Sequence, residues 1–338
     1  MSLKSFAYRV ARSTGGFRLA SRWSRGRLCV LCYHGFSFMD EHEFRPKLFM
    51  TPDRFESRMR WLKLSGYATL TIGEAVERMR AGRLRDKEIV VTIDDGFHGV
   101  FALAAPILCG LGMTATVYVT TYYVVKQSPV FRLAMQYLFW KTKRGAVRLG
   151  ESRVGLPEQM PTKGSEGERA LDTLIDWAET ALDESARIGL TRQLAARLDV
   201  DYDELCSSRR LTLMNAEEIR GLADKGFDIQ LHTHRHRIPK EPSLVMREIE
   251  DNRRVLAPLT GRPLTDLCYP SGAWSHTMWP ALSAAGVRTA TTCDVNLNRT
   301  DTPPLALTRF LDFHDMPEIV FEAELCGLGS LLRAALRR

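Results

Sequence analysis

The sequence predicts an α/β protein built on a parallel sheet or barrel. Short apolar runs typical of buried strands alternate with amphipathic segments typical of helices, and the connections between them are brief. The runs at residues 28–33 and 88–93 are almost wholly apolar, as expected of strands covered on both faces. A chain of 338 residues, 45% hydrophobic and 26% charged, can bury a large core. Fibrous and disordered classes are therefore excluded.

Apolar spacing and end signals predict the individual elements. Pro52 opens a helix that places Phe55, Met59 and Leu62 on one face, and Gly66 ends it. Further helices are expected over residues 72–79, 102–111, 215–225, 244–256 and 278–285. Strands are expected over residues 88–93, 115–121, 227–231 and 288–292, with one more that ends near residue 269.

Residues 125–205 interrupt this alternation. A polar stretch rich in Gly and charge comes first, and a helical pattern of apolar residues follows it. We interpret this region as an insertion, helical in character, that follows one strand of the main domain. The predicted organisation is a basic amphipathic tail over residues 1–27, a main domain over residues 28–124 and 206–315, the insertion over residues 125–205, and a carboxyl-terminal tail over residues 316–338.

The positive charge of the chain is concentrated at its amino end. The formal net charge is +7, and residues 1–28 hold seven basic residues and no acid. The rest of the chain is therefore neutral overall, and we expect no nucleic-acid partner. Leu3, Phe6 and Val10 have helical spacing and predict a segment that can lie on an anionic membrane surface; a mobile, solvated tail is the alternative. The basic residues are Lys4, Arg9, Arg12, Arg18, Arg22, Arg25 and Arg27.

The cysteines and the absence of targeting signals predict a cytoplasmic protein. Seven scattered cysteines do not form a disulfide framework, and Cys29 and Cys32 lie in an apolar run typical of the core. No stretch approaches the ~18 consecutive apolar residues that span a membrane, and no secretory signal is apparent. Peripheral attachment at the inner membrane face is compatible with the basic amino terminus.

Two adjacent carboxylates follow the strand at residues 88–93. Asp94 and Asp95 would repel each other unless a cation or a proton lay between them, and Gly96 permits a tight turn. A metal on one carboxylate leaves the other free as a base. Taken alone, such a turn is more often a solvated loop or a helix cap.

Three of the eight histidines follow the strand at residues 227–231. His232 and His236 are four residues apart across a turn and can face one ion; His with carboxylate suits zinc or a similar divalent metal. His234 alternates away from them and is expected to support the site or to lie at the surface. The cluster favours a metal site over an isolated structural histidine.

A third strand end carries a rigid turn. Pro270 and Gly272 follow the strand that ends near Tyr269, and backbone N–H groups of such a turn, with Ser271 at its centre, can hold an oxyanion. By itself this would be an ordinary strand-to-helix turn. Together the three strand ends provide the groups for metal-assisted hydrolysis of an amide or an ester.

These motifs resemble those of the polysaccharide deacetylases, the NodB-homology or carbohydrate esterase 4 family. Residues 92–96, TIDDG, resemble the family's TFDDG motif; residues 232–236 resemble its HTxxH motif; and residues 268–272 resemble its RxPxG motif, in family order. The resemblance covers roughly residues 28–124 and 206–312. It implies an irregular (β/α)7 barrel, a metal on Asp95, His232 and His236, and Asp94 as the base that activates a metal-bound water.

The sequence departs from the family pattern at two positions. The Arg of the third motif, which braces the base in the family, is Cys268 here, and Arg309 is our candidate to replace its charge. The usual late Leu-x-His acid is also absent. Tyr33-His34 resembles the Tyr-His of the poly-N-acetylglucosamine deacetylase branch, which makes His34 the candidate acid, with His314 as the fallback.

The resemblance implies a hydrolase that removes an N-acetyl or related N-acyl group from an amino sugar in a polysaccharide, an oligosaccharide or a glycolipid precursor. The expected cofactor is a divalent metal, zinc first, with Co, Ni or Mn as alternatives. Tyr269, Pro270 and Trp274 are the expected substrate contacts, and Ser271 supplies the backbone N–H for the oxyanion. A catalytically inactive carbohydrate-binding relative and a hydrolase of a non-sugar amide are the competing hypotheses.

Overall fold

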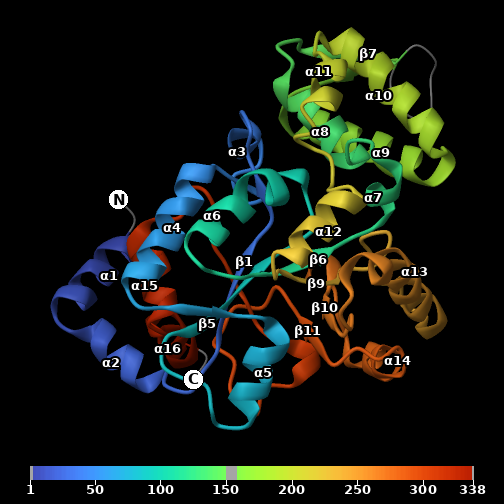
Figure 1. The fold of residues 1–338 in the computed structure, drawn as a ribbon. Helices are drawn as coiled ribbons and strands as arrows, with labels where there is room; N and C mark the ends of the chain where they lie inside the picture. The colour runs from blue at the N-terminus through green and yellow to red at the C-terminus, as the bar shows by residue number, and fades with distance from the viewer. Residues whose placement is uncertain (1–2, 150–157, 337–338) are drawn as a thin grey trace. The chain divides into compact units, whose positions relative to one another are not determined.

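The computed structural model describes residues 3–149 and 158–336. The chain forms two compact units (Figure 1). Unit 1 joins Met1–Val125 to Met214–Arg338, and unit 2 is Lys126–Leu213, inserted in sequence between those two stretches.

A single parallel sheet forms the centre of unit 1 (Figure 1). Leu307, just before the last strand, bridges Thr291 at the far edge, so the two ends of the sheet approach each other and the sheet curls. This arrangement confirms the predicted α/β class and fits the irregular (β/α)7 barrel. The order is β11 (Thr289–Thr291), β10 (Asp266–Cys268), β9 (Asp228–Leu231), β6 (Thr116–Val119), β5 (Glu88–Ile93), β1 (Cys29–Tyr33) and β12 (Phe310–Leu311), with β4 (Ala68–Leu70) beside the first half of β5.

Helices cover the outer face of the sheet at the positions that apolar spacing predicts. Phe55, Met59 and Leu62 are all fully buried on one face of their helix, as the sequence indicates. The helices are α4 (Pro52–Leu64), α5 (Ile72–Arg80), a π-helical turn (Val100–Ala104) that leads into α6 (Ala105–Gly110), α12 (Ala216–Asp224), α13 (Pro242–Thr260) and α14 (Trp279–Ala284). Shorter elements are β2 (Gly35–Phe36), α3 (Glu41–Phe44), β3 (Phe49–Met50) and α7 (Tyr122–Lys126).

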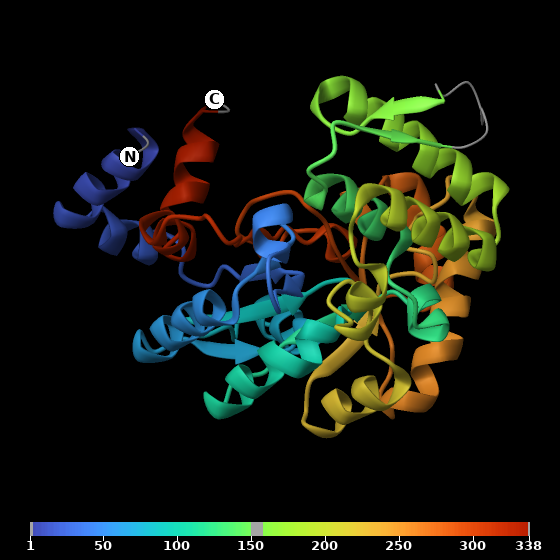
Figure 2. The same ribbon diagram turned by 90° about the horizontal axis from the view of Figure 1, so that it is seen from above.

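Four helices from the two ends of the chain pack together in unit 1. α1 (Leu3–Ser13) contacts α2 (Gly16–Trp23) and α15 (Glu318–Leu325), and α16 (Leu328–Leu336) contacts α2 and α15. Figures 1 and 2 show both termini on the same side of the unit. Tyr8 and Ala20 are buried, and Arg12 pairs with Glu322 at 3.1 Å. Residues 3–23 are therefore packed helices and not the mobile tail that was one of the two expectations for this segment.

Unit 2 is mainly helical and has its own core. Met135, Leu174, Ile175 and Leu198 are almost fully buried within it. Its elements are α8 (Phe131–Lys141), an antiparallel pair β7 (Ala146–Arg148) and β8 (Gln159–Pro161), α9 (Gly164–Ala181), α10 (Glu184–Leu198) and α11 (Tyr202–Ser207). In neither unit does a helix of the described chain have both the length and the apolar character needed to cross a bilayer.

The buried face of α4 gives a test of the core. Phe55 has no exposed surface and packs edge-on against Tyr33 and Phe36, with ring centroids 5.1 and 4.6 Å away. Phe55→Ala is expected to lower the free energy of unfolding by about 3–5 kcal/mol, because the cavity it leaves cannot collapse fully. Leu64→Ala, on the same helix at 88% exposure, is the matched control and should change it by less than about 0.5 kcal/mol. Chemical denaturation measures both, and equal effects would contradict this packing.

Candidate active site

The candidate residues lie where successive strands of unit 1 end. His34 follows β1, Asp94 and Asp95 follow β5, and the histidine loop follows β9. Parallel strands bring their carboxyl ends to one edge of the sheet, which is where α/β barrels gather functional groups. Arg309 approaches from the opposite direction, since it immediately precedes β12.

Asp95, His232 and His236 converge on one point. The Nε2 atoms of both histidines lie 3.2 Å from Oδ1 of Asp95, and one ligand atom from each residue lies within 4.8 Å of the other two. The imidazole rings are 4.9 Å apart and nearly perpendicular. Although burial raises the pKa of Asp95, hydrogen bonds to the two histidines hold that pKa well below its usual range. One carboxylate oxygen and two imidazole nitrogens form a donor set that fits zinc or a similar divalent ion.

The second ring nitrogen of His232 fixes its orientation. Nδ1 lies 2.8 Å from the carbonyl oxygen of Cys268, which can only accept, so Nδ1 carries a proton and Nε2, which faces Asp95, is the nitrogen that would meet a bound ion. The backbone N–H of His232 donates to Oδ1 of Asn252 at 3.0 Å, and Nδ2 of Asn252 donates to the carbonyl of Val119 at 2.9 Å. These contacts hold the imidazole before any ion arrives.

The ligand loops use backbone conformations that side chains rarely adopt. Asp95, Thr233 and His236 have φ angles of 68°, 63° and 54°. Such strained positions persist only where their surroundings over-determine them, and they cluster at functional sites. His236 is 43% exposed while His232 is almost fully buried, so the group opens to solvent on the His236 side.

Asp94 is a buried carboxylate with a charged partner. Nη1 of Arg309 donates to its Oδ1 at 2.7 Å, and both side chains are almost fully buried. Burial raises the pKa of Asp94, but the charge and hydrogen bond of Arg309, together with the nearby His34 and His232, outweigh burial and lower the pKa to about 2. Asp94 is therefore ionised at neutral pH. The position of Arg309 agrees with its expected role as the substitute for the motif Arg.

Cys268, at the sequence position of the motif Arg, contacts both members of this ion pair. Its Sγ lies 3.2 Å from Oδ2 of Asp94 and 3.1 Å from Nη2 of Arg309. Burial raises the pKa of this thiol well above its ordinary value, so it stays protonated and donates to the carboxylate. Other groupings that could attract a cation include Asp94 with Cys32 and His34, or with His232 and Cys268. The adjacent guanidinium disfavours a cation at Asp94, which leaves Asp95 as the better ligand.

His34 faces the other side of Asp94. Its Nε2 lies 3.8 Å from Oδ2 of Asp94, and its Nδ1 is buried with no hydrogen-bond partner among the described residues. Burial lowers the pKa of His34, against the opposing effect of Asp94. His314, the fallback acid, instead lies against His42 with ring centroids 4.7 Å apart, and no described contact joins it to the aspartates.

The third turn differs in part from its expected role. Pro270–Gly272 forms a tight turn in which Ser271 (φ 56°) and Gly272 (φ 67°) adopt left-handed backbone conformations. Pro270 is buried, and Tyr269 is 1% exposed with its hydroxyl donating to the carbonyl of Leu305 at 2.9 Å. The Tyr269 side chain is thus part of the core, which corrects its assignment as a substrate contact.

Trp274 is the accessible aromatic residue of this region. It is half-buried, its Nε1 donates to Asp294 at 3.2 Å, and its ring stacks on Trp279 with centroids 6.0 Å apart and planes within 6°.

His234 has the supporting position expected of it, since its Nδ1 contacts Oγ1 of Thr121 at 2.8 Å.

Asn252 is the supporting residue that sequence reasoning missed. It lies on α13 within the buried face formed by Val245, Ile249 and Leu256. A fully buried amide in an apolar helical stripe needs hydrogen-bond partners, and that irregularity was a readable signal.

Residues 201–290 match the sequence pattern of the family described as polysaccharide deacetylase. This stretch of the chain is similar to that family. A 93-residue stretch is 32% identical to YxkH of Bacillus subtilis (strain 168), whose name assigns it provisionally to the same family. That stretch covers 27% of this chain and 31% of YxkH, about a third of the relative's length.

Solved structures of deacetylases share the fold. The Streptococcus pyogenes deacetylase PplD in complex with acetate has a TM-score of 0.58 at 16% identity, covering 88% of this chain and 97% of PplD. IcaB from Ammonifex degensii has a TM-score of 0.54 at 17% identity, covering 89% of this chain and 97% of IcaB. At this identity the likeness shows the fold alone.

The two histidines of the loop provide a matched test of the metal site. His236→Ala removes a converging nitrogen and is expected to weaken zinc binding by more than about a hundredfold, because even losing a supporting partner costs about 10–100-fold. His234→Ala, two residues away and turned toward Thr121, should retain stoichiometric zinc. Titration calorimetry on metal-free protein measures both. Retention of zinc by the His236 variant would show that the ion is held elsewhere.

The ion pair at Asp94 gives a pH-dependent test. Arg309→Met leaves a buried carboxylate without its counter-charge and should lower the free energy of unfolding at pH 7 by about 3–5 kcal/mol. Without Arg309, burial raises the pKa of Asp94. The buried, unpaired carboxylate then lowers the stability of the folded state at neutral pH, and this cost disappears as acid protonates the carboxyl. The stability difference from wild type should therefore shrink between about pH 7 and pH 4.

Arg309→Lys keeps the positive charge and is the control for this series. Denaturation curves across the pH range compare the three proteins. A constant difference between wild type and Arg309→Met would show that lost packing, and not the charge, causes the effect.

Proposed function

We propose that the chain is a metal-dependent hydrolase that removes an N-acetyl or related N-acyl group from an amino sugar. The observation that carries the proposal is the convergence of Asp95, His232 and His236 on one point beside an ionised Asp94. A bound divalent ion, zinc first and Co, Ni or Mn as alternatives, supplies an acidified water and polarises the acyl oxygen.

Each residue around this point has a separate role in the proposed reaction. Asp94 accepts the proton of the attacking water, and Arg309 keeps it ionised for this role. The backbone N–H of Ser271 stabilises the oxyanion, and His34 donates a proton to the leaving nitrogen. Arg309 keeps Asp94 charged and fixes one of its oxygens, which leaves Oδ2 toward His34.

A carbohydrate substrate is supported by two half-buried tryptophans near the third turn. The parallel rings of Trp274 and Trp279 present apolar faces with polar edges, which suit the C–H faces and hydroxyl rim of a sugar ring. The substrate class is a polysaccharide, an oligosaccharide or a glycolipid precursor. All seven cysteines are free thiols, and three of them are buried around β1 and β10, which supports a reducing, cytoplasmic location.

An inactive scaffold is the competing function, and the position of Arg309 argues against it. The missing motif Arg was the reason to consider that alternative. A guanidinium nevertheless lies 2.7 Å from the base, so the charge is present although its place in the sequence has changed. A non-sugar amide hydrolase shares the same chemistry and is separated from the proposal by substrate preference.

Asp94→Asn tests the assignment of the two aspartates. Acetate release from chitooligosaccharides, or from nucleotide- or lipid-linked N-acetyl sugars, should fall by at least about a hundredfold because the base is lost. Metal content should stay at the wild-type level, since Asp95 holds the ion. Loss of metal from this variant would reverse the two assignments, and release from none of these sugars by the metal-loaded wild type would sink the sugar hypothesis.

A further inference from the structure

We propose that α1, α2 and α16 form a docking surface that attaches unit 1 to an anionic lipid bilayer. The inference concerns a face of the molecule that the chemistry at Asp94 does not use, and it stands independently of the proposed activity. It comes from the side chains that these helices expose, their charges and their place in the fold.

Each of the three helices exposes a pair of large apolar side chains one turn apart. Six of the twelve large hydrophobic side chains that are exposed in the described chain lie on these helices. The inward positions hold Ser5 and Tyr8 on α1, Ala20 on α2, and Gly329 and Ser330 on α16. The exposed pairs are Phe6 and Val10 (54% and 46% exposed), Leu19 and Trp23 (66% and 36%), and Leu332 and Leu336 (45% and 87%).

This arrangement is the reverse of an ordinary surface helix. A helix that packs only on a protein core buries its large apolar residues and exposes polar ones. Here several inward positions are small or polar while the large residues face solvent, and the helices are neighbours, since α2 contacts both α1 and α16 (Figure 2). Apolar side chains clustered on adjacent helices mark an interaction surface.

The charged residues on the three helices themselves are all basic. No acidic residue occurs between residues 3 and 28 or in α16. Arg12 and Arg333 pair with Glu322 and Glu324 of α15, which neutralises the carboxylates beneath the surface. The remaining basic residues Lys4, Arg9, Arg18 and Arg22 form no ion pair within residues 3–149 and 158–336.

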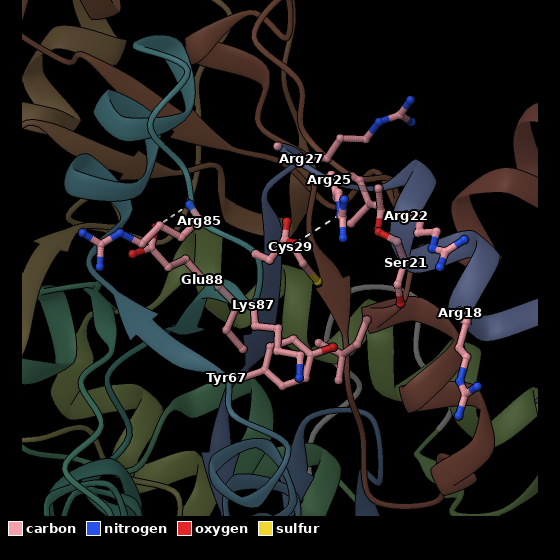
Figure 3. Close-up of a pocket in the computed structure, with 16 residues that line it drawn as sticks. Arg18, Ser21, Arg22, Arg25, Arg27, Cys29, Tyr67, Arg85, Lys87 and Glu88 are labelled. Carbon is pink, nitrogen blue, oxygen red and sulfur yellow. Dashed lines mark hydrogen bonds and ion pairs between the residues drawn. The ribbon is translucent and has the colours of Figure 1, made fainter.

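A basic pocket extends the surface beyond α2. Figure 3 shows Arg18 and Arg22 from α2 and Arg25 and Arg27 from the turn after it on one side of the pocket, with Lys87 opposite. Among these basic residues, Arg25 forms an ion pair with Asp86 at 3.2 Å. The guanidinium of Arg27 stacks over the ring of Trp23 at 3.3 Å. Basic groups beside exposed Trp and Leu are the composition of helices that lie in the headgroup region of anionic membranes.

The pocket also fixes the orientation of the docked protein. It is lined by Cys29 and Glu88, the first residues of β1 and β5. His34 and Asp94 follow the last residues of the same two strands. The docking surface and the candidate active site are therefore at opposite ends of the sheet, and a docked molecule presents its site away from the lipid.

Charge complementarity favours a bilayer over a second copy of the chain. A symmetric dimer through this face would bring two sets of unpaired basic groups against each other, which is unfavourable. An anionic leaflet supplies the opposite charge and an apolar layer at the same depth as the exposed side chains.

Vesicle flotation with the full chain tests the proposal. The protein should float with vesicles of equal parts phosphatidylcholine and phosphatidylglycerol, should not float with phosphatidylcholine alone, and should be released by high salt. Equal binding to both vesicles, or to neither, would overturn it. Because this measurement uses the wild-type protein, it does not depend on the folding of any variant.

Two double variants locate the surface. Arg18→Gln with Arg22→Gln should weaken binding to the anionic vesicles by about thirtyfold, from about 1 kcal/mol for each charge. Leu19→Ser with Trp23→Ser should weaken it by at least about tenfold. The matched controls lie on other surfaces and should bind like wild type: Arg169→Gln with Arg220→Gln, and Leu64→Ser with Leu244→Ser.

Two further readouts separate the alternatives. Deacetylation of a soluble oligosaccharide should be the same for all four double variants, so that loss of vesicle binding without loss of turnover isolates the surface from the proposed function. Light scattering of the lipid-free protein should give a monomer mass. A dimer that dissociates in the Leu19/Trp23 variant would assign the face to a second copy and overturn the proposal.

Discussion

The buried ion pair between Asp94 and Arg309 is the interaction on which the site depends. Two adjacent carboxylates at the end of β5 would otherwise repel each other in a region shielded from water. The guanidinium neutralises one of them at 2.7 Å, and the other is left to the two imidazoles. One cation of the protein thus distinguishes two chemically identical neighbours, of which we propose Asp94 as the base and Asp95 as the metal ligand.

The same pair links distant parts of the sheet. Arg309 also donates from Nε to the carbonyl of Thr292 at 3.0 Å and from Nη1 to Oγ1 of Thr92 at 3.2 Å. Its guanidinium therefore contacts or approaches groups from β5, β10 and the end of β11. A charged group satisfied on all sides in this way is favourable where an isolated buried charge is not. A short side chain such as Cys268 leaves the volume that this guanidinium needs.

The sequence predicted the longer strands of the sheet better than the short ones. The strands that end at Asp94 and at His232 were foreseen because long apolar runs stop abruptly at polar clusters. The two-residue β12 and the three-residue β4 were not, because such short segments have no readable period and exist only through pairing with β1 and β5.

The sequence also could not show which residues far apart in the chain come into contact. Arg309 could be nominated by its charge, but its contact with Asp94 depends on the curl of the sheet, which no local pattern encodes. Tyr269 was misjudged for a related reason, since its hydroxyl is satisfied by Leu305 from a distant loop. The packing of α1 and α2 on the carboxyl-terminal helices is likewise a long-range contact.

The position of Arg309 in the sequence determines when, during synthesis of the chain, Asp94 can acquire its counter-charge. β1 and β5 are made early, whereas Arg309 immediately precedes β12, which follows the other strands of the described sheet in the sequence. Until β12 docks beside β1, the acidic pair lacks the charge of Arg309 and the sheet has an open edge. The counter-charge of the proposed base therefore arrives only with the final closure of the sheet.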